Sequence, residues 1–212
     1  MRRTGARILR RRQSTVLTNA ARGAARDDMG EREEIGDGDF GAGRGGVSAD
    51  AVIIRPAVPA DLPAIGRLGA LLVRVHHDFD AQRFIAPTQR TEHGYASFLG
   101  SQLGDPHVVV LVAERGGEVQ GYTYAGVEGH DYMALRGPAG VLYDIVVDPA
   151  RRGAGVGRML LDATLAALRA RGAPRVMLST AERNEPAQRL FARAGFRRTM
   201  IEMTRELEGD AS

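Results

Sequence analysis

The chain has 212 residues, enough for one ordinary domain, and its hydrophobic share of 43% is typical of a globular core. It contains no cysteine, which excludes disulfides, cysteine nucleophiles and thiolate metal sites, and no apolar run approaches the roughly 18 residues of a membrane helix. All 29 basic residues are arginine, and the net charge of +3 is distributed unevenly along the chain. We therefore expect a cytoplasmic protein with no membrane partner.

The uneven charge lies at the beginning of the chain. Residues 1–26 carry eight arginines and no acid, whereas residues 27–50 carry two arginines and eight acids. Such a segment cannot bury enough apolar surface to offset roughly 1–2 kcal/mol of entropy per ordered residue, so we expect residues 1–50 to be disordered. An arginine-rich start is typical of an organelle presequence or a nucleic-acid arm, and also of an extension without function. The rest of the chain is nearly neutral, which gives no electrostatic case for nucleic-acid binding.

The apolar pattern after residue 50 predicts one α/β domain spanning residues 51–212. A short strand at 52–56 precedes a helix that Asp61 can cap, and a second helix covers 88–103. Two strands joined by a tight turn form a hairpin over 107–128. Strands and helices then alternate over residues 140–147, 155–171, 175–180, 185–194 and 196–207. The order β-α-α-β-β-β-α-β-α-β predicts a mixed sheet flanked by helices.

The most informative stretch follows the strand at 140–147. Asp148 and Pro149 end this strand, and glycines at alternate positions then open a long helix: Gly153, Gly155 and Gly157. Glycines let backbone N–H groups converge on a ligand, and a helix start adds unpaired N–H groups and about half a positive charge. This combination favours a pyrophosphate, which Arg152 and Arg158 could also contact. The stretch fits neither the Rossmann fingerprint nor the lysine-containing P-loop, and a plain glycine-rich turn is the alternative.

Two motifs resemble signatures of the GNAT superfamily, the acyl-CoA-dependent N-acyltransferases. The first, (Q/R)-x-x-G-x-(G/A), is matched at every fixed position by Arg152, Gly153, Ala154, Gly155, Val156 and Gly157. The second, N-x-x-A-x-x-L-(Y/F)-x-x-x-G-F, begins at Asn184 and ends at Phe196, one helix and one strand later. Taken alone, the second motif is a well-capped amphipathic helix, with Asn184 as its cap and Gly195 as its left-handed stop. The resemblance covers residues 52–207.

The resemblance implies a GNAT-like fold in which two central strands splay apart and the pantetheine arm of acetyl-CoA lies between them. The amine attacks the thioester directly in a ternary complex, so no nucleophilic side chain and no metal is needed. Backbone groups of the strand at 140–147 would pair with pantetheine, and the glycine turn would hold the pyrophosphate. The implied cofactor-binding residues are Ile145, Val146, Val147, Arg152, Gly153, Ala154, Gly155, Val156, Gly157, Arg158, Asn184 and Phe191.

Asp144 and Tyr143 are the candidate catalytic residues, because they lie on the strand where the thioester is expected. Asp144 could accept the amine proton through water or with a raised pKa; alternatively, it orients the substrate cation or satisfies backbone groups. Many family members use a tyrosine on the last helix to protonate the thiolate, but Phe191 stands at that position here. Tyr143, Tyr122 and Tyr124 are candidate replacements, and each is equally a candidate for sheet packing.

Two further segments are candidates for the acceptor site. The first is the end of the first helix, His76-His77-Asp78-Phe79-Asp80, which is also consistent with an ordinary polar helix end. It makes a weak metal site, because adjacent side chains point in different directions. The second is the loop at 129–138, which carries His130, Asp131, Tyr132 and Arg136.

The leading hypothesis is an N-acetyltransferase that acts on an amine of a small molecule, peptide or protein, with acetyl-CoA as co-substrate. One alternative is a non-catalytic acyl-CoA-binding regulatory module, consistent with Phe191 in place of tyrosine. Another is a nucleic-acid-associated protein that acts through its arginine-rich start. Analogy with the family suggests a homodimer.

Overall fold

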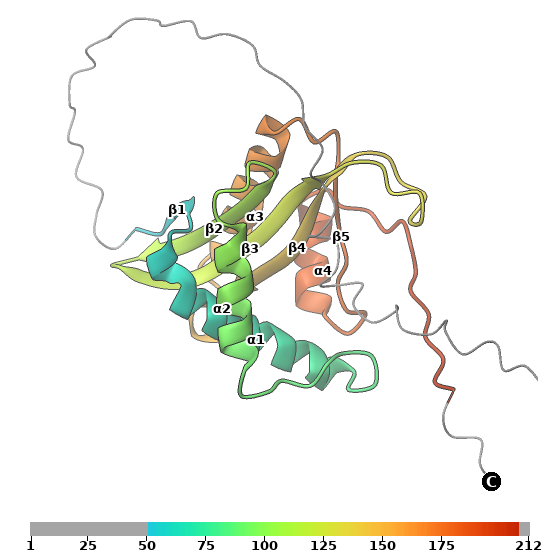
Figure 1. The fold of residues 1–212 in the computed structure, drawn as a ribbon, viewed down its shortest axis with the longest axis horizontal. Coiled ribbons are helices and arrows are strands. Elements are labelled where there is room, and N and C mark those ends of the chain that lie inside the picture. Colours follow the sequence, from blue (N-terminus) through green and yellow to red (C-terminus); the bar gives the residue numbers. More distant parts are fainter. Residues whose placement is uncertain (1–50, 208–212) are drawn as a thin grey trace, which may run out of the picture. The chain divides into compact units, whose positions relative to one another are not determined.

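The computed structural model describes residues 51–207, which Figure 1 shows in colour. The disorder predicted for residues 1–50 lies outside the described residues, as does the end of the chain after residue 207. Residues 51–207 form a mixed sheet with helices on both faces, so the predicted α/β fold class is confirmed.

Five strands form one continuous sheet. They are β1 (Ile53–Pro56), β2 (Val108–Arg115), β3 (Glu118–Glu128), β4 (Ala139–Val147) and β5 (Val176–Leu178). Their order in the sheet is β1-β2-β3-β4-β5, so neighbours in space are neighbours in sequence. The pairs from β1 to β4 are antiparallel, and β5 runs parallel to β4 after the helical crossover that a parallel pair requires.

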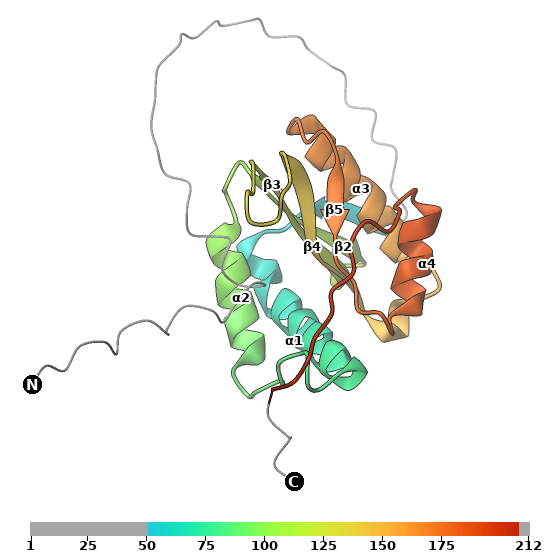
Figure 2. The same cartoon turned by 90° about the vertical axis from the view of Figure 1, so that its right-hand side faces the viewer.

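Different helices cover the two faces of the sheet, as Figure 1 and Figure 2 show. The helices are α1 (Leu62–Phe79), α2 (Thr91–Gln102), α3 (Val156–Ala170) and α4 (Glu185–Arg193), with short 3-10 turns η1 (Pro59–Asp61) and η2 (Pro149–Arg151). Ile65 of α1 and Leu99 of α2 belong to the core on one face, while Leu161 of α3 and Phe191 of α4 belong to the core on the other. None of these helices, within residues 51–207, is both long and apolar enough to cross a membrane.

Two glycines let α2 lie close against α1. A Cβ at Gly66 would lie 2.6 Å from the carbonyl oxygen of Glu92, and a Cβ at Gly69 would lie 2.3 Å from the ring of Tyr95. Only a residue without a Cβ fits such approaches. The close packing holds Tyr95 against the core that α1 and α2 share with the sheet.

The sheet opens between β4 and β5. Backbone pairing joins Gly140 with Val176 at one end and Leu142 with Leu178 at the other, and stops there. Because β4 continues to Val147, its residues 143–147 pair only with β3 among the described residues. β4 and β5 therefore separate beyond Leu142, as the GNAT resemblance implies for two of its strands.

An ion-pair network joins β1 to the start of α1. Arg55 donates to both carboxylate oxygens of Asp61, at 2.7 and 2.8 Å, and to Glu114 of β2 at 2.6 Å. Asp61 also accepts a hydrogen bond from the N–H of Val58 at 2.8 Å. Asp61 precedes α1 as expected, but its side chain does not cap the helix, because these partners occupy its oxygens.

The strand predicted at 196–207 does not form, since these residues belong to neither a helix nor a strand. Two contacts direct the segment away from the sheet: Arg198 donates to Gln188 at 3.1 Å, and Glu202 pairs with Arg83 in the α1–α2 loop. β5 has only three residues and offers a short edge for pairing. The large apolar side chains of the segment consequently remain exposed: Met200, Ile201, Met203 and Leu207.

Candidate functional site

The predicted anion cradle lies where β4 ends and α3 begins. Asp148 accepts a hydrogen bond from the N–H of Ala150 at 2.8 Å, which starts the turn η2. Gly153 and Gly155 follow with φ angles of 86° and 78°, in the left-handed region, and Gly155 is the N-cap of α3. A side chain would be strained at either position, so the turn requires glycine. The first N–H groups of α3 therefore face the turn without carbonyl partners inside the helix.

The side chains of the cradle differ in exposure. Val156 is 2% exposed and packs with Leu160 in the core, so only its backbone is available to a ligand. Arg152 is exposed, and Arg158 forms an ion pair with Asp162 at 2.7 Å. The cradle thus presents backbone N–H groups, with two arginines at its rim.

A free backbone edge of β4 leads into the cradle. Ile145, Val146 and Val147 pair with β3 on one side. On the side of β5 these three residues have no strand partner within residues 51–207. Their free N–H and C=O groups can bind an extended ligand in the way that a neighbouring strand would.

A β-bulge in the middle of β4 brings two adjacent side chains to one face. The register with β3 shifts next to Tyr124 and leaves Tyr143 as the extra residue. Leu142 belongs to the core under α3, whereas Tyr143 packs against the core under α1 and α2. Asp144 lies on the same face as Tyr143, because it binds Tyr122 of the α1–α2 core.

Asp144 is a partly buried carboxylate held by a tyrosine. The hydroxyl of Tyr122 donates to Oδ2 of Asp144 at 2.9 Å, and Tyr122 itself is completely buried. Burial raises the pKa of Asp144 to about 6, and the hydrogen bond from Tyr122 opposes this rise. Asp144 is therefore mostly ionised at pH 7, yet a stronger base than an ordinary aspartate.

Tyr95 is a neighbour of Asp144 that sequence reasoning missed. It comes from α2, and burial, with a contribution from the charge of Asp144, raises its pKa well above the usual value. The same two causes raise the pKa of Tyr124. The signal for Tyr95 was present in Gly69 of α1, whose missing side chain leaves room for the tyrosine ring. Together with Tyr122, these tyrosines make the surroundings of Asp144 aromatic.

The hydroxyl of Tyr143 binds the end of β3 and not Asp144. It donates to Oε1 of Glu128, while its ring stacks on Tyr124 with centroids 4.7 Å apart. Glu128 also pairs with Arg136 of the loop between β3 and β4. Burial raises the pKa of Tyr143 to about 12. Tyr143 therefore links the loop to the bulge, and its catalytic role stays a prediction.

The loop at 129–138 has a polar base and an apolar tip. Asp131 bridges to Arg136 across the base and accepts hydrogen bonds from the N–H groups of Met133 and Ala134, at 3.0 and 2.9 Å. At the tip, Tyr132 and Met133 are 80% and 91% exposed. The loop's role as an acceptor wall stays a prediction.

The polar end of α1 is engaged with the backbone. Nδ1 of His76 lies 2.9 Å from the carbonyl oxygen of Leu72, and Nδ1 of His77 lies 3.0 Å from that of Phe84. Over residues 51–207, no group of three or more His, Asp or Glu side chains is placed to hold a metal ion. These contacts fit the polar helix end that the sequence also allowed.

Asn184 and Phe191 have structural roles in α4. Oδ1 of Asn184 accepts a hydrogen bond from the N–H of Ala187 at 3.3 Å, so Asn184 caps the helix as expected. Phe191 is 6% exposed and packs edge-to-face on Phe196. Contact of either residue with a cofactor stays a prediction.

Comparisons with known proteins agree on one family. The model of the acetyltransferase (GNAT) family matches residues 72–196. A mycothiol acetyltransferase from Thermobispora bispora is 42% identical over 97 residues, 44% of this chain and 31% of that protein. One from Thermomonospora curvata is 37% identical over 94 residues, 44% of this chain and 29% of that protein. The chain thus matches less than a third of the length of these two relatives.

Solved structures share the fold. The structure of a GCN5-related N-acetyltransferase from Ralstonia eutropha is 25% identical, with a TM-score of 0.57, over 75% of this chain and 100% of that one. A mutant of the BH1408 protein from Bacillus halodurans is 21% identical, with a TM-score of 0.64, over 73% and 99% of the two chains, and is similar in fold alone. The family match covers more than half of the sequence. The chain therefore belongs to the acetyltransferase (GNAT) family.

Proposed function

We propose that the chain is an N-acetyltransferase that moves an acetyl group from acetyl-CoA to a primary amine of a small molecule, a peptide or a protein. The observation that carries this proposal is the arrangement along β4. Asp144, the free backbone edge at 145–147 and the glycine cradle follow one another in that order. Membership in the GNAT family supports acetyl-CoA as the co-substrate.

The residues present fit acetyl-CoA. The negative pyrophosphate is attracted by the free N–H groups of the cradle and by the positive end of α3. The amides of the pantetheine arm can pair with the free edge of β4. At Gly153 and Gly155, no atom lies within 4 Å of where a Cβ would stand, so the turn is open to a ligand. With these ends fixed, the thioester would lie beside Asp144.

In the proposed reaction, the neutral amine attacks the thioester carbonyl, and a C–N bond forms as the C–S bond breaks. An alkyl amine has a pKa of roughly 8 to 10, so its deprotonation at pH 7 costs roughly 1–5 kcal/mol. Asp144, with its pKa raised to about 6, accepts this proton directly or through one water. The aromatic surroundings of Asp144 suit the alkyl part of an amine and attract its cationic form.

Protonation of the leaving group needs no tyrosine on α4. Phe191 stands where many GNAT members have that tyrosine, and it cannot donate a proton. A thiol has a pKa of roughly 8.5, so the thiolate can leave and take its proton from water at a modest cost. Phe191 is also the observation that favours the second candidate, a module that binds acyl-CoA without turning it over.

Thermal unfolding of the full chain with and without acetyl-CoA tests the binding. At 100 times its Kd, a ligand stabilises the fold by about 2.7 kcal/mol, which should raise the melting temperature by roughly 5–10 °C. We expect Gly155→Glu to abolish this rise, because its carboxylate would repel the pyrophosphate. Gly172→Glu is a matched control that should keep it, since Gly172 also has a left-handed φ of 79° and open space, but lies after the other end of α3.

Turnover of acetyl-CoA with a panel of amines then separates the two candidates. Acetylation of any amine supports the enzyme, whereas binding without turnover across the panel supports the regulatory module. A folded wild-type chain whose melting temperature does not respond to acetyl-CoA would contradict both.

A further inference from the structure

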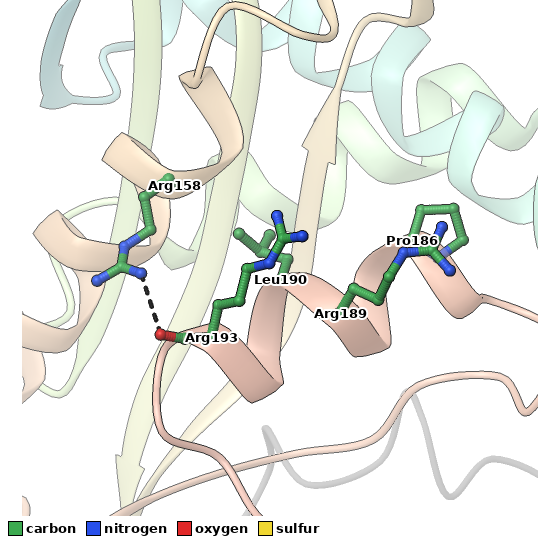
Figure 3. A pocket seen from close by; sticks show the side chains of 5 residues that line it. All are labelled: Arg158, Pro186, Arg189, Leu190 and Arg193. Carbon is green, nitrogen blue, oxygen red and sulfur yellow. Dashed lines mark hydrogen bonds between the residues drawn. The ribbon is translucent and has the colours of Figure 1, made fainter.

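Two arginines that Figure 3 shows form ion pairs typical of a protein surface. Arg158 and Arg189 lie beside a hollow of about 290 Å³, and the members of their ion pairs are about half exposed or more. Surface pairs of this kind contribute little to stability. The network that joins Arg136, Glu128 and Tyr143 is different, because Arg136 and Glu128 are only 13% and 18% exposed. A network that is this well buried and lies next to Asp144 in the chain calls for a role.

The side chain of Tyr143 runs along the sheet to the end of β3. A Cβ at Gly126 would lie 3.5 Å from the Tyr143 ring and 3.6 Å from its hydroxyl. The hydroxyl donates to Oε1 of Glu128, the last residue of β3, and Arg136 donates to Oε2 of the same carboxylate. Hydrogen bonds to a carboxylate are stronger than those between neutral groups. Tyr143 is therefore held at its hydroxyl by Glu128, and at its ring by stacking on Tyr124.

The loop between β3 and β4 fixes the far end of this network. The backbones of Asp131 and Arg136 exchange two hydrogen bonds, at 2.9 and 3.0 Å. The guanidinium of Arg136 also lies 3.6 Å from the carboxylate of Asp131. Arg136 is thus held by its backbone as well as by its side chain, which gives Glu128 a fixed partner.

The bulge in β4 needs such an anchor. The extra residue of a bulge is left unpaired and the ladder is disrupted around it, so the ladder alone specifies its position weakly. If the bulge moved by one residue toward the end of β4, Asp144 would become the unpaired residue in place of Tyr143 and lose its register with Tyr124. It would then leave the buried position in which it accepts a hydrogen bond from Tyr122. The contacts that hold Tyr143 oppose this movement, because they would have to break.

We propose that Glu128 is a positioning residue for Asp144: by holding the hydroxyl of Tyr143, it keeps the bulge in place and the Asp144 carboxylate on the face under α1 and α2. The inference rests on the proposed role of Asp144 as the base. It gives the hydroxyl of Tyr143 a role in anchoring the strand, distinct from proton transfer.

An NMR titration of the Asp144 carboxyl in the full chain tests this role and needs no substrate. The wild type should titrate with a pKa of about 6. In Glu128→Leu the hydroxyl of Tyr143 loses its acceptor, and we expect the pKa of Asp144 to fall toward about 4, the ordinary value of an aspartate, because burial is the main cause of its rise. Tyr143→Phe should give the same fall, since it keeps the ring and removes only the hydroxyl. It also carries the comparison if Glu128→Leu does not fold.

Two further variants are controls. Glu128→Gln removes the same negative charge but keeps an oxygen that accepts from Tyr143, so the pKa of Asp144 should stay near that of the wild type. Glu118→Leu changes the first residue of β3, whose exposed carboxylate pairs with Arg151 at 2.9 Å, and should also leave that pKa unchanged. Thermal unfolding of each variant shows that it is folded under the conditions of the titration.

The titrations decide the role of Glu128. A pKa of Asp144 that is unchanged in folded Glu128→Leu or in Tyr143→Phe would overturn the positioning role and leave the network as an anchor of the loop alone. A fall of equal size in Glu128→Gln would assign the effect to charge and would overturn the role as well. The proposed function fails by a separate measurement, because a chain that neither binds nor turns over acetyl-CoA still gives these titrations.

Discussion

Asp144 combines features that a surface carboxylate lacks. Its position on the bulge turns it toward the aromatic face under α1 and α2, and burial there disfavours the charged form. The hydroxyl of Tyr122 favours the charged form, because it donates to Oδ2. The balance of the two puts the pKa at about 6, between an ordinary carboxylate and the pH at which the proposed reaction would run.

This balance predicts the pH dependence of the proposed enzyme. A base must be ionised to act, so kcat/KM should fall below about pH 6, where Asp144 becomes protonated. Tyr122→Phe removes the hydrogen bond that lowers this pKa. The acidic limb of the profile of kcat/KM against pH should therefore move to higher pH. Tyr124→Phe is the control, because Tyr124 makes no hydrogen bond to Asp144, and it should leave the limb in place. An unchanged limb in Tyr122→Phe, or in Asp144→Asn, would rule out Asp144 as the titrating group.

At the scale of elements, the contact between α1 and α2 sets where the aromatic face lies. Gly69 allows the ring of Tyr95 to approach α1, and Tyr95 then packs above the sheet near Asp144. Sequence alone predicted both helices, but a helix of low apolar periodicity such as α2 gives no hint of which face it buries.

We predict that Gly69→Ala destabilises the fold by about 1–3 kcal/mol, because its Cβ would lie 2.3 Å from the Tyr95 ring and force it to move. Gly94→Ala is the matched control in α2, where no atom lies within 4 Å of the new Cβ. It should leave stability unchanged or raise it by up to about 1 kcal/mol, since alanine favours helices over glycine. Urea denaturation measures both values. Equal stability of Gly69→Ala and the wild type would show that Tyr95 is free to move.

The elements that sequence predicted well are those specified by local physics. The apolar spacing of α1, the asparagine cap of α4 and the left-handed glycine that ends α4, Gly195, each act within a few neighbouring residues. The features it did not reveal depend on partners far away in the chain. The segment at 196–207 has strand-like residues but no strand beside it, and the bulge at Tyr143 lies in an apolar run that looks regular.

At the scale of the whole domain, the network of Arg55 joins its first strand to two later elements. Asp61 is 6% exposed, and the Arg55 guanidinium beside it holds the pKa of Asp61 below its usual range. A carboxylate with a lowered pKa stabilises the fold above its unfolded pKa and loses that contribution as the pH falls through its folded pKa. The network should therefore contribute fully at neutral pH and fade in acid.

We predict that Arg55→Met lowers the free energy of unfolding by about 2 kcal/mol at pH 7, because it leaves the buried Asp61 carboxylate without its cation. The loss should shrink at an acid pH below the lowered pKa of Asp61, where this carboxyl is protonated in either protein. Arg151→Met is the matched control: it breaks the pair with Glu118, whose members are 46% and 62% exposed, and should change stability by less than about 1 kcal/mol. Denaturant unfolding at the two pH values measures both effects, and a loss for Arg55→Met that does not depend on pH would refute the role given to Asp61.

The extra residue in β4 also divides that strand into two halves, and side chains at even-numbered positions face opposite sides of the sheet in the two halves. Before the bulge, the even positions Gly140 and Leu142 face α3; after it, the odd positions Ile145 and Val147 do. In a regular strand, side chains two residues apart share a face, so the carboxylate of Asp144 would point into the apolar core beneath α3. One inserted residue thus exchanges the two faces of half a strand, and the only charged side chain of β4 lies on the face under α1 and α2, beside the proposed position of the amine.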